Sequence, residues 1–597
     1  MPARASVCTR VAASAPWLLL AVTAVSTLAY RSPRGGTPVA FVGDGSGYVA
    51  PSFDSATRGL AIRQPARERV GLAVERGSEV VNDGANAEPK APDAVDSAGY
   101  DCETLGEAFT YGANEPMLKQ IRSRCAKLRL LERELGVNPY PEIQAVAAAD
   151  LAEMGQVAAA HRDLEKGDEV EGLLYRVHGR IMSIRFDGMF VVLQDSKGGE
   201  LQIMFRKKGT VEVAGTAYES GDIGRIIDIG DVIEVRGHVK KTSSGEITLV
   251  AHSLTVLAKC LLPMPDGFHG LKDVSTRMRL RHLDIMTNKD VRKQLLQRSK
   301  MVWLLRRFLH DRGFVEVETP ILYHGYSGAN ATPFETKSEA LDEKLYLRIA
   351  PEFFLKRLIT GGLADKVFEI GKCFRNEGTS TRHSPEFTMV EMYQQLADAR
   401  DMMRLMEELV AALAEGLGVA TPTFKTQSMR DLIEIHTGID VGKHDREGLM
   451  ALLAERWADA PDLAGMTWGD LVCALFKQEV EDRIVDPVHV TELPAEVAPL
   501  ASASGAYGRV FESYIGGMEV AHGCTEQCHP LELLRKLDGC RLEGLGHARD
   551  KEFLNAVAYG MPPTGGLGVG VDRLLMALTG TSSIKNAQTF PLLKNVY

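Results

Sequence analysis

The sequence predicts an α+β protein in which a small β-barrel precedes a larger domain with an antiparallel β-sheet flanked by helices. Five short β-rich segments separated by Gly and Asp lie within residues 169–262, and helices mix irregularly with short strands from residue 263 onward. The 597 residues, 45% hydrophobic and 25% charged, are typical of a globular chain with several domains. We therefore divide the chain into residues 1–100, 101–168, 169–262 and 263–597.

Composition excludes several classes of protein. The 69 Lys and Arg against 79 Asp and Glu give a net charge of −10, which argues against a nucleic-acid coat protein that is basic throughout but allows a local basic surface. Nine Cys in so long a chain are too few for a disulfide scaffold, so we expect a reducing compartment.

Residues 1–100 have the features of a targeting presequence followed by a disordered linker. The first 43 residues contain no Asp or Glu, and the apolar run from Trp17 to Ala29 is shorter than the roughly 20 residues that span a bilayer. An Arg-, Ala- and Gly-rich stretch follows to about Arg69. This order resembles the two-part presequence of algal plastid proteins. We expect a plastid protein, with a mitochondrion as the alternative, and no stable membrane association after the presequence is removed.

Residues 101–168 are expected to form a helical extension. Apolar residues recur every three or four positions from Leu118 to Leu135, which predicts a helix that ends before Pro139. The rest of this helix is basic, and its cations favour a helix that faces nucleic acid, with a solvated charged face as the alternative. They are Lys119, Arg122, Arg124, Lys127, Arg129 and Arg133.

Residues 169–262 predict a five-stranded barrel of the oligonucleotide-binding (OB) type. The expected strands are Leu173–Ile184, Phe190–Asp195, Leu201–Phe205, Val232–Val239 and Glu246–His252. Single-stranded RNA is bound by stacking, by cations and by hydrogen bonds to base edges. One set of side chains on the barrel offers all three and is called here the barrel set: Arg185, Phe190, Gln202 and Glu246. Each of them alone is more commonly an ordinary strand residue.

Residues 263–597 are expected to form an antiparallel sheet with segregated helices. The expected helices are 292–312, 399–417 and 446–457, and the expected strands are 314–318, 344–349, 366–374 and 386–393. The sequence contains neither GxxxxGK[ST] nor a strand-borne GxGxxG. If ATP binds, it therefore binds to another fold.

Three stretches of this domain combine residues that suit nucleotide chemistry. Val367–Tyr393 places Arg375, Glu377, Arg382 and His383 around a turn, and Phe387, Glu391 and Tyr393 then share one face of a strand. Arg509–Glu519 contains Glu512 and Glu519, two candidate Mg²⁺ ligands. Gly565–Met576 is a glycine-rich segment that lets the backbone approach a nucleotide, followed by Arg573.

Together these stretches resemble the second and third motifs of class II aminoacyl-tRNA synthetases, and Gly313–Pro320 resembles the first motif, at their dimer interface. Among these enzymes the lysyl-tRNA synthetases are similar from about Asn114 to Thr589. Segments that resemble them in order include Leu193-Gln-Asp195, Arg348-Ile-Ala-Pro-Glu352, Arg375-Asn-Glu-Gly378 and Pro385-Glu-Phe-Thr388.

The resemblance implies a role for each candidate residue and implies ATP, Mg²⁺, L-lysine and tRNA(Lys) as ligands of a homodimer. The catalytic residues would be Arg375, on the lysine carboxylate and the α-phosphate, and Arg573, on the γ-phosphate. ATP would also contact Glu377, His383, Phe387 and Glu512, while Glu512 and Glu519 would hold Mg²⁺. The substrate α-ammonium would meet Glu352 and the carbonyl of Gly328, and the ε-ammonium would meet Glu391, Tyr393 and Glu526. The barrel set would contact the anticodon.

The chain departs from the family at three positions. His522 replaces an Asn that contacts the substrate, Cys524 replaces an aromatic wall, and Thr332 replaces an Arg before Pro333. Loss of that apolar wall would weaken lysine binding by about 1–3 kcal/mol. A zinc site at His522, Cys524, Cys528 and His529 is a second hypothesis for this segment, because the ligand types fit.

These observations predict a lysine–tRNA ligase of an organelle that makes lysyl-adenylate and transfers lysine to tRNA. The alternatives are an aspartyl- or asparaginyl-tRNA synthetase, a ligase that attaches lysine to an elongation factor, and a catalytically weakened paralogue that binds RNA. Two carboxylates and a phenol suit an ammonium side chain rather than aspartate or asparagine.

Overall fold

The computed structural model describes residues 114–142, 151–265, 271–325, 331–457, 462–539 and 550–594. The expected presequence and linker, residues 1–100, and the candidate Gly328 lie outside these residues. Within the described part of the chain, no helix has both the length and the apolar character needed to cross a membrane.

The helical extension begins with α2 (Glu115–Arg129), which continues as a π-helical turn over Leu130–Glu134 and confirms the predicted helix. Two side chains of its basic face bond to the barrel. Arg124 donates to the carbonyl of Cys260 at 2.7 Å, and the Lys127 ammonium donates to two carbonyls and pairs with Asp228 at 2.9 Å. For these two residues the prediction of a side chain facing nucleic acid is wrong, because both fasten the helix to the barrel. A short helix, α3 (Met154–Ala160), follows.

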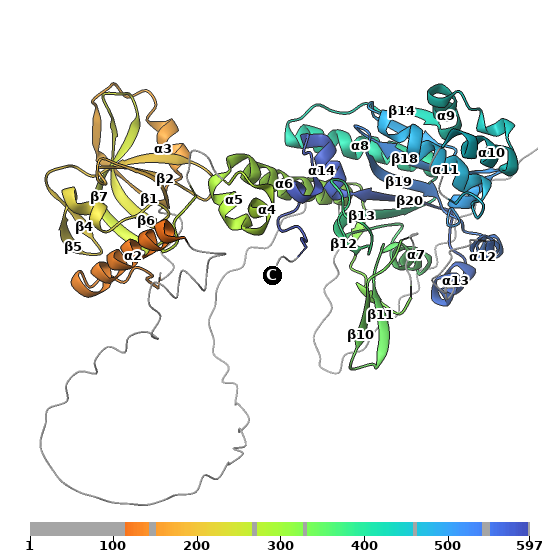
Figure 1. Cartoon of the computed structure of the whole chain (residues 1–597), viewed down its shortest axis with the longest axis horizontal. Coiled ribbons are helices and arrows are strands. Elements are labelled where there is room, and N and C mark those ends of the chain that lie inside the picture. The colour runs from red at the N-terminus through yellow and green to blue at the C-terminus, as the bar shows by residue number, and fades with distance from the viewer. Residues whose placement is uncertain are drawn as a thin grey trace, which may run out of the picture. The chain divides into compact units, whose positions relative to one another are not determined.

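The barrel confirms all five predicted strands. They are β1 (Glu169–Arg185), β2 (Phe190–Gln194), β3 (Glu200–Met204), β6 (Val232–Lys241) and β7 (Ile247–Ala258). The order β3-β2-β1-β6-β7 is closed by pairing of β3 with β7 (Figure 1). Inward side chains such as Val177, Ile181 and Val191 form its core. A hairpin of β4 (Thr210–Val213) and β5 (Thr216–Glu219), which pairs with β7 through β4, was not predicted.

The domain formed by residues 263–597 contains an eight-stranded sheet in the order β14-β15-β18-β19-β20-β13-β12-β8. Its strands are β8 (Val315–Glu316), β12 (Lys366–Phe374), β13 (Glu386–Gln395), β14 (Lys425–Ser428), β15 (Val488–Thr491), β18 (Val510–Tyr514), β19 (Glu519–Thr525) and β20 (Thr564–Gly570). The six central strands are antiparallel, as predicted, but the edge strands β8 and β14 each run parallel to their neighbour. The predicted antiparallel sheet is therefore confirmed, and the two parallel edge pairings add to it.

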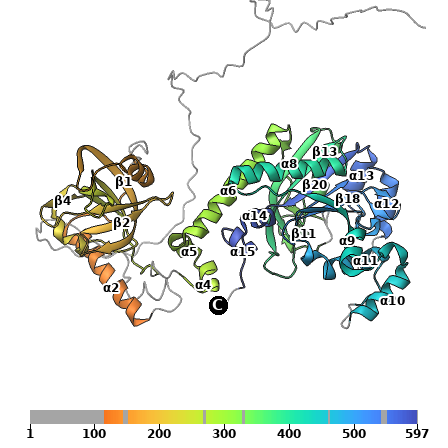
Figure 2. The same ribbon diagram turned by 90° about the horizontal axis from the view of Figure 1, so that it is seen from above.

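Helices cover one face of this sheet. These helices are α6 (Lys289–Asp311), α8 (Ala399–Leu417) and α14 (Val571–Thr579) (Figure 2). They share one apolar core with the sheet residues Val390, Met392, Leu567 and Val569. A second core joins α9 (Met429–Thr437), α10 (Arg446–Arg456) and α11 (Trp468–Glu479) to side chains of β15, β18 and β19. The helices predicted at 292–312, 399–417 and 446–457 are confirmed.

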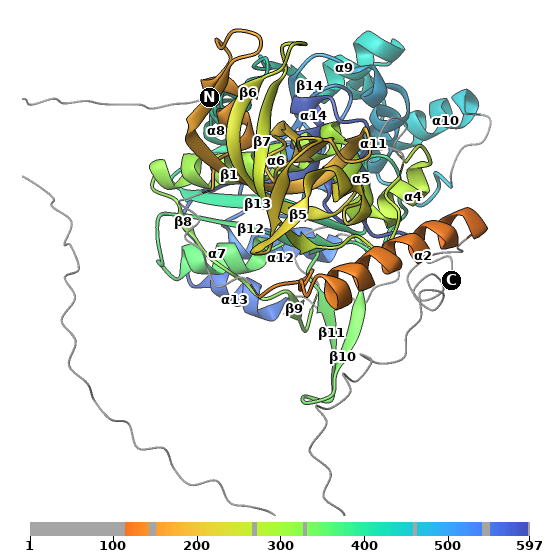
Figure 3. The same cartoon turned by 90° about the vertical axis from the view of Figure 1, so that its left-hand side faces the viewer.

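The remaining elements lie around these cores. They are α4 (Val274–Arg279), α5 (Arg281–Thr287), α7 (Glu352–Thr360), α12 (Pro530–Gly539), α13 (Lys551–Ala558), α15 (Ile584–Ala587), β16 (Ala503–Ser504) and β17 (Tyr507–Gly508). A small sheet of β9 (Leu322–Tyr323), β10 (Glu335–Ser338) and β11 (Glu343–Leu347) includes a hairpin that projects from the domain (Figure 3).

Candidate active site

A row of glycines forms the floor of the candidate site. Gly566, Gly568 and Gly570 alternate along β20, so they share the sheet face opposite the helices α8 and α14. A Cβ on Gly566 would lie 2.0 Å from a carboxylate oxygen of Glu526 and 2.7 Å from the Tyr393 ring. The absence of side chains at these positions lets the side chains of the neighbouring strands lie directly over β20, and this glycine strip is called the trough below.

The register brings the predicted lysine-binding residues to both sides of this trough. Tyr393 on β13 and Cys524 on β19 are paired across Gly566. Glu391 and His522 are paired in the same way across Gly568. Because paired residues of adjacent strands point to one face, these side chains surround a single space.

Glu391, Tyr393 and Glu526 form a buried acidic cluster, which is called the acidic hollow below. Each of the three is only 4% exposed, and the Tyr393 hydroxyl donates to Glu391 at 3.1 Å. Burial, together with the charge of Glu352, raises the pKa of Glu391 to about 8. Burial likewise raises the pKa of Tyr393, so its phenol remains a donor. A cation that enters this hollow would favour the ionised form of Glu391.

Sequence reasoning missed a cation that is already part of the hollow. Lys356 on α7 is 1% exposed, and its ammonium pairs with Glu352 and, at 2.5 Å, with Glu526. The same nitrogen lies 5.7 Å from the centre of the Tyr393 ring. Although burial opposes the charged form, the carboxylates of Glu352 and Glu526 raise the pKa of Lys356, which stays an ammonium. The spacing of Glu352 and Lys356, one helical turn apart, was the only signal in the sequence.

Arg375 lies at the end of β12 with its guanidinium 5.1 Å from the centre of the Phe387 ring. Its Nε is buried and has no hydrogen-bond partner among the residues that the structure describes. A buried donor without a partner is costly, and an anion such as a carboxylate or phosphate would satisfy it. The ring beside it offers a stacking face for a base. This arrangement fits the roles predicted for Arg375 and Phe387.

Arg573, His383 and Glu519 meet at the other end of the trough. The Arg573 guanidinium donates to His383 Nε2 at 3.0 Å and pairs with Glu519 at 3.3 Å. Burial and the nearby Arg573 charge lower the pKa of His383, which keeps the imidazole neutral. Glu377 is exposed on the loop after Arg375.

The two candidate Mg²⁺ ligands, Glu512 and Glu519, have a third carboxylate in their neighbourhood. The Tyr514 hydroxyl donates to Glu512 at 2.7 Å. Burial and the charge of Glu519 raise the pKa of Glu481, which sequence reasoning missed because it lies in a separate 3₁₀ turn, Glu481–Arg483. Hard cations prefer such carboxylate oxygens, so the donor set fits Mg²⁺.

The segment that departs from the family does not form a zinc site. The His522 Nδ1 lies 3.8 Å from a carboxylate oxygen of Glu512. The Cys524 thiol donates to Glu526 at 3.4 Å, and the Cys528 thiol donates to the Pro562 carbonyl at 3.1 Å. Among the described residues, three potential ligand atoms lie within 4.8 Å of one another only at Glu169, Glu171 and His238 on the barrel, where Lys240 and Arg206 already pair with Glu169. The zinc candidates do not meet this criterion, and neither do Glu481, Glu512 and Glu519, whose fit to Mg²⁺ rests on the donor type alone. The zinc hypothesis at His522, Cys524, Cys528 and His529 is therefore wrong. The Thr332 side chain is exposed, and its carbonyl accepts from the Asn376 amide at 2.7 Å.

The barrel set lies on one outer face. Arg185 is paired with Phe190, and Gln202 is paired with Thr248, to which its amide donates at 2.8 Å. Glu246 lies two residues before Thr248 and is exposed. The barrel set has a neighbour that sequence reasoning missed. Phe186 is 72% exposed, has a φ of +51°, and meets the Phe190 ring edge to face at 6.2 Å.

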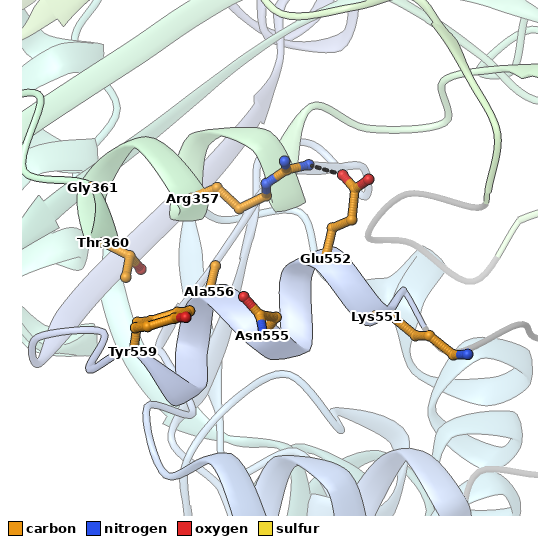
Figure 4. A pocket seen from close by; sticks show the side chains of 8 residues that line it. All are labelled: Arg357, Thr360, Gly361, Lys551, Glu552, Asn555, Ala556 and Tyr559. Carbon is orange, nitrogen blue, oxygen red and sulfur yellow. Dashed lines mark ion pairs between the residues drawn. The ribbon is translucent and has the colours of Figure 1, made fainter.

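A shallow pocket of about 570 Å³ lies elsewhere, between α7 and α13. It is lined by Arg357, Thr360, Gly361, Lys551, Glu552, Asn555, Ala556 and Tyr559, and Arg357 pairs with Glu552 at 3.0 Å (Figure 4). None of the predicted site residues lines it. The candidate site is therefore the glycine-floored trough and not this pocket.

Comparison with known proteins agrees with this geometry. The family described as tRNA synthetases class II (D, K and N) matches residues 273–594, and an OB-fold nucleic acid binding domain matches residues 175–257. The chain is 42% identical to a lysine–tRNA ligase of Agrobacterium fabrum over 79% of this chain and 96% of that protein. It is 41% identical to the one of Rhizobium johnstonii, over 78% and 95%. The enzyme of Carboxydothermus hydrogenoformans is 39% identical, over 79% and 98%. The chain belongs to the lysine–tRNA ligase family of class II tRNA synthetases.

Proposed function

We propose that this chain activates L-lysine with ATP, giving lysyl-adenylate and pyrophosphate, and transfers the lysyl group to tRNA(Lys). The observation on which the proposal rests is the buried hollow of Glu391, Tyr393 and Glu526, together with the buried Arg375 Nε, which has no partner among the described residues. A buried acidic hollow repels an aspartate carboxylate, its charge is not balanced by a neutral asparagine amide, and it receives an ammonium. The aspartyl and asparaginyl alternatives are therefore not favoured.

In the proposed reaction the lysine carboxylate attacks the α-phosphate in line and pyrophosphate leaves. Arg375 grips both reacting groups, and Arg573 holds the distal phosphate, so the two cations lower the barrier by positioning and by stabilising charge. His383 and Phe387 hold the nucleotide, with Glu377 on the loop above it. Glu512 and Glu519, with Glu481 nearby, would hold Mg²⁺, which supplies further positive charge to the phosphates.

The open face of the barrel favours tRNA as a substrate. This face presents an aromatic ring, a cation and two hydrogen-bonding side chains, which is the chemistry that single-stranded anticodon bases need. A lysine ligase that acts on a protein would not need this face. We assign the anticodon to the barrel set, Arg185, Phe190, Gln202 and Glu246.

A homodimer is part of the proposal. Apolar side chains of α6, of the segment resembling the first motif and of the two residues after that segment are exposed in the single chain, namely Leu296, Trp303, Val315, Ile321 and Leu322. Exposed apolar patches of this kind mark protein interfaces. Sedimentation of the purified chain is expected to give twice the monomer mass.

The proposed location is a plastid, with a mitochondrion as the alternative. The support is the acid-free, Arg-containing start with its short apolar run at residues 17–29. A fluorescent protein fused behind residues 1–100 is expected to enter the plastid of an alga. Entry into the mitochondrion would favour the alternative.

The activity is tested by ATP–pyrophosphate exchange with the full chain. Lysine is expected to support exchange, whereas aspartate and asparagine are not. Binding of an anticodon stem-loop without any lysine-dependent exchange would instead identify a paralogue that only binds RNA.

A further inference from the structure

The lysine-binding hollow contains more acid than its substrate can neutralise. The carboxylates of Glu352, Glu391 and Glu526 are linked through one cation, Lys356, and the Tyr393 phenol. L-lysine brings two ammonium groups, and its own carboxylate is matched by Arg375. Three carboxylates facing two ammonium groups would leave one buried negative charge unbalanced, and an unpaired buried charge is strongly unfavourable.

Lys356 removes this excess. Its ammonium is fixed between Glu352, on the same helix, and Glu526, which follows β19. One ammonium against three carboxylates leaves two negative charges, which equals the positive charge of the two substrate ammonium groups. We propose that Lys356 is a positioning residue that tunes the hollow to a diamine-type substrate by neutralising one carboxylate and holding Glu352 and Glu526 in place. This inference rests on the proposed function.

The other groups around Lys356 agree with this role. Its nitrogen lies 5.7 and 5.8 Å from the ring centres of Tyr393 and Phe553, so aromatic faces cover it on the sides where no carboxylate lies. The Cys524 thiol donates to the second oxygen of Glu526, at 3.4 Å. Glu526 is thus held by two neighbours and cannot turn toward the substrate freely. Glu391, which contacts only the Tyr393 hydroxyl among these groups, remains the carboxylate available to the ε-ammonium.

The role also predicts a pH effect. Burial and then the charge of Glu352 already favour the protonated form of Glu391, while the Tyr393 hydroxyl, Lys356 and Arg375 oppose it. Removal of the Lys356 charge leaves Glu352 and Glu526 uncompensated, so Glu391 would lose its proton only at higher pH. A lysine that served only to stabilise the fold would not move the pH dependence of substrate binding.

The test compares Lys356→Met with Lys356→Arg in lysine-dependent ATP–pyrophosphate exchange by the full chain. We expect Lys356→Met to raise the KM for lysine by at least about tenfold, with the KM for ATP nearly unchanged, and to shift the acid limb of kcat/KM for lysine by about one pH unit upward. Lys356→Arg keeps the positive charge, so its acid limb is expected to lie close to the pH at which the unmodified chain shows it. The matched control is Lys425→Met, which removes an exposed lysine paired with Asp486 and should change neither parameter.

A double variant, Lys356→Met with Glu526→Gln, keeps the proposed surplus of two negative charges. It separates an effect of charge from a folding defect caused by the loss of Lys356. In this double variant, the acid limb of kcat/KM for lysine is expected to lie close to its position in the unmodified chain. An unchanged pH limb and lysine KM in Lys356→Met would overturn the inference while leaving the ligase function intact. The inference would also be overturned if Lys356→Met and the double variant both showed a higher KM for ATP, a lower kcat and a lower thermal stability, each to the same extent. Absence of lysine-dependent exchange in the unmodified chain would reject the proposed function itself.

Discussion

The barrel face and the acidic hollow both arise from side chains that adjacent strands place on one side, yet they differ in exposure and charge. On the barrel, Arg185 and Glu246 are exposed and Phe190 is half-buried, so each residue can act nearly independently. In the hollow, Glu391 and Glu526 are buried, and the proton affinity of each depends on its neighbours. A substitution on the barrel should therefore change one contact, whereas a substitution in the hollow should change the whole site.

Loss of the Arg375 guanidinium is expected to give the largest effect. Arg375→Ala removes the cation proposed to grip both reacting groups, so lysine-dependent exchange should fall by at least about 1,000-fold. Binding of an anticodon stem-loop, measured by fluorescence anisotropy, should stay within about twofold because the barrel is untouched. Loss of both properties together would contradict the separation of the two regions.

Gly566→Ala tests the floor of the trough. The new Cβ would lie 2.0 Å from the Glu526 carboxylate, so either that side chain or the strand must move. We expect the KM for lysine to rise by about 100-fold, since both the Tyr393 and Glu526 contacts are disturbed. The matched control is Gly465→Ala, at a loop position with open space around it. An unchanged KM for lysine in Gly566→Ala would show that the substrate does not lie over this glycine.

The pH dependence of lysine binding tests the buried charge of the hollow. Because the pKa of Glu391 is raised to about 8, this group carries a proton at neutral pH and must lose it to pair with the ε-ammonium. The kcat/KM for lysine should therefore rise about tenfold per pH unit below 8 and level off above it. Calorimetry in buffers of different ionisation enthalpy should detect release of nearly one proton per lysine bound at pH 7. Proton uptake, or a flat profile from pH 6 to 8, would contradict the assignment of the ε-ammonium to Glu391.

The two regions also differ in how far the sequence predicts them. Strand periodicity places Phe387, Glu391 and Tyr393 on one face, and the same rule groups Phe190 with its partners on the barrel. Lys356 escaped this reasoning because its partner Glu526 comes from a distant part of the chain, and only folding brings the two together. Glu481 escaped for the same reason. The β4–β5 hairpin was missed because its strands are only four residues each.

The smallest expected effect concerns Phe186 on the barrel. A bulky residue with φ of +51° is strained, and such strain often accompanies function. The turn that holds it is fixed, because Gly188 packs against Gly224 so closely that a Cβ would lie 2.7 Å from the Gly224 amide. The exposed ring beside Phe190 can stack on a second base.

Phe186→Ala should therefore raise the KM for tRNA(Lys) by about threefold and Phe190→Ala by about tenfold, with lysine-dependent exchange unchanged in both. Leu174→Ala, at another exposed apolar residue of the barrel, is the control. Equal KM values for Phe186→Ala, the control and the unmodified chain would mean that only Phe190 contacts a base. A loss of lysine-dependent exchange in either phenylalanine variant would instead show that the barrel and the hollow are coupled. A barrel substitution would then change more than its own contact with the tRNA.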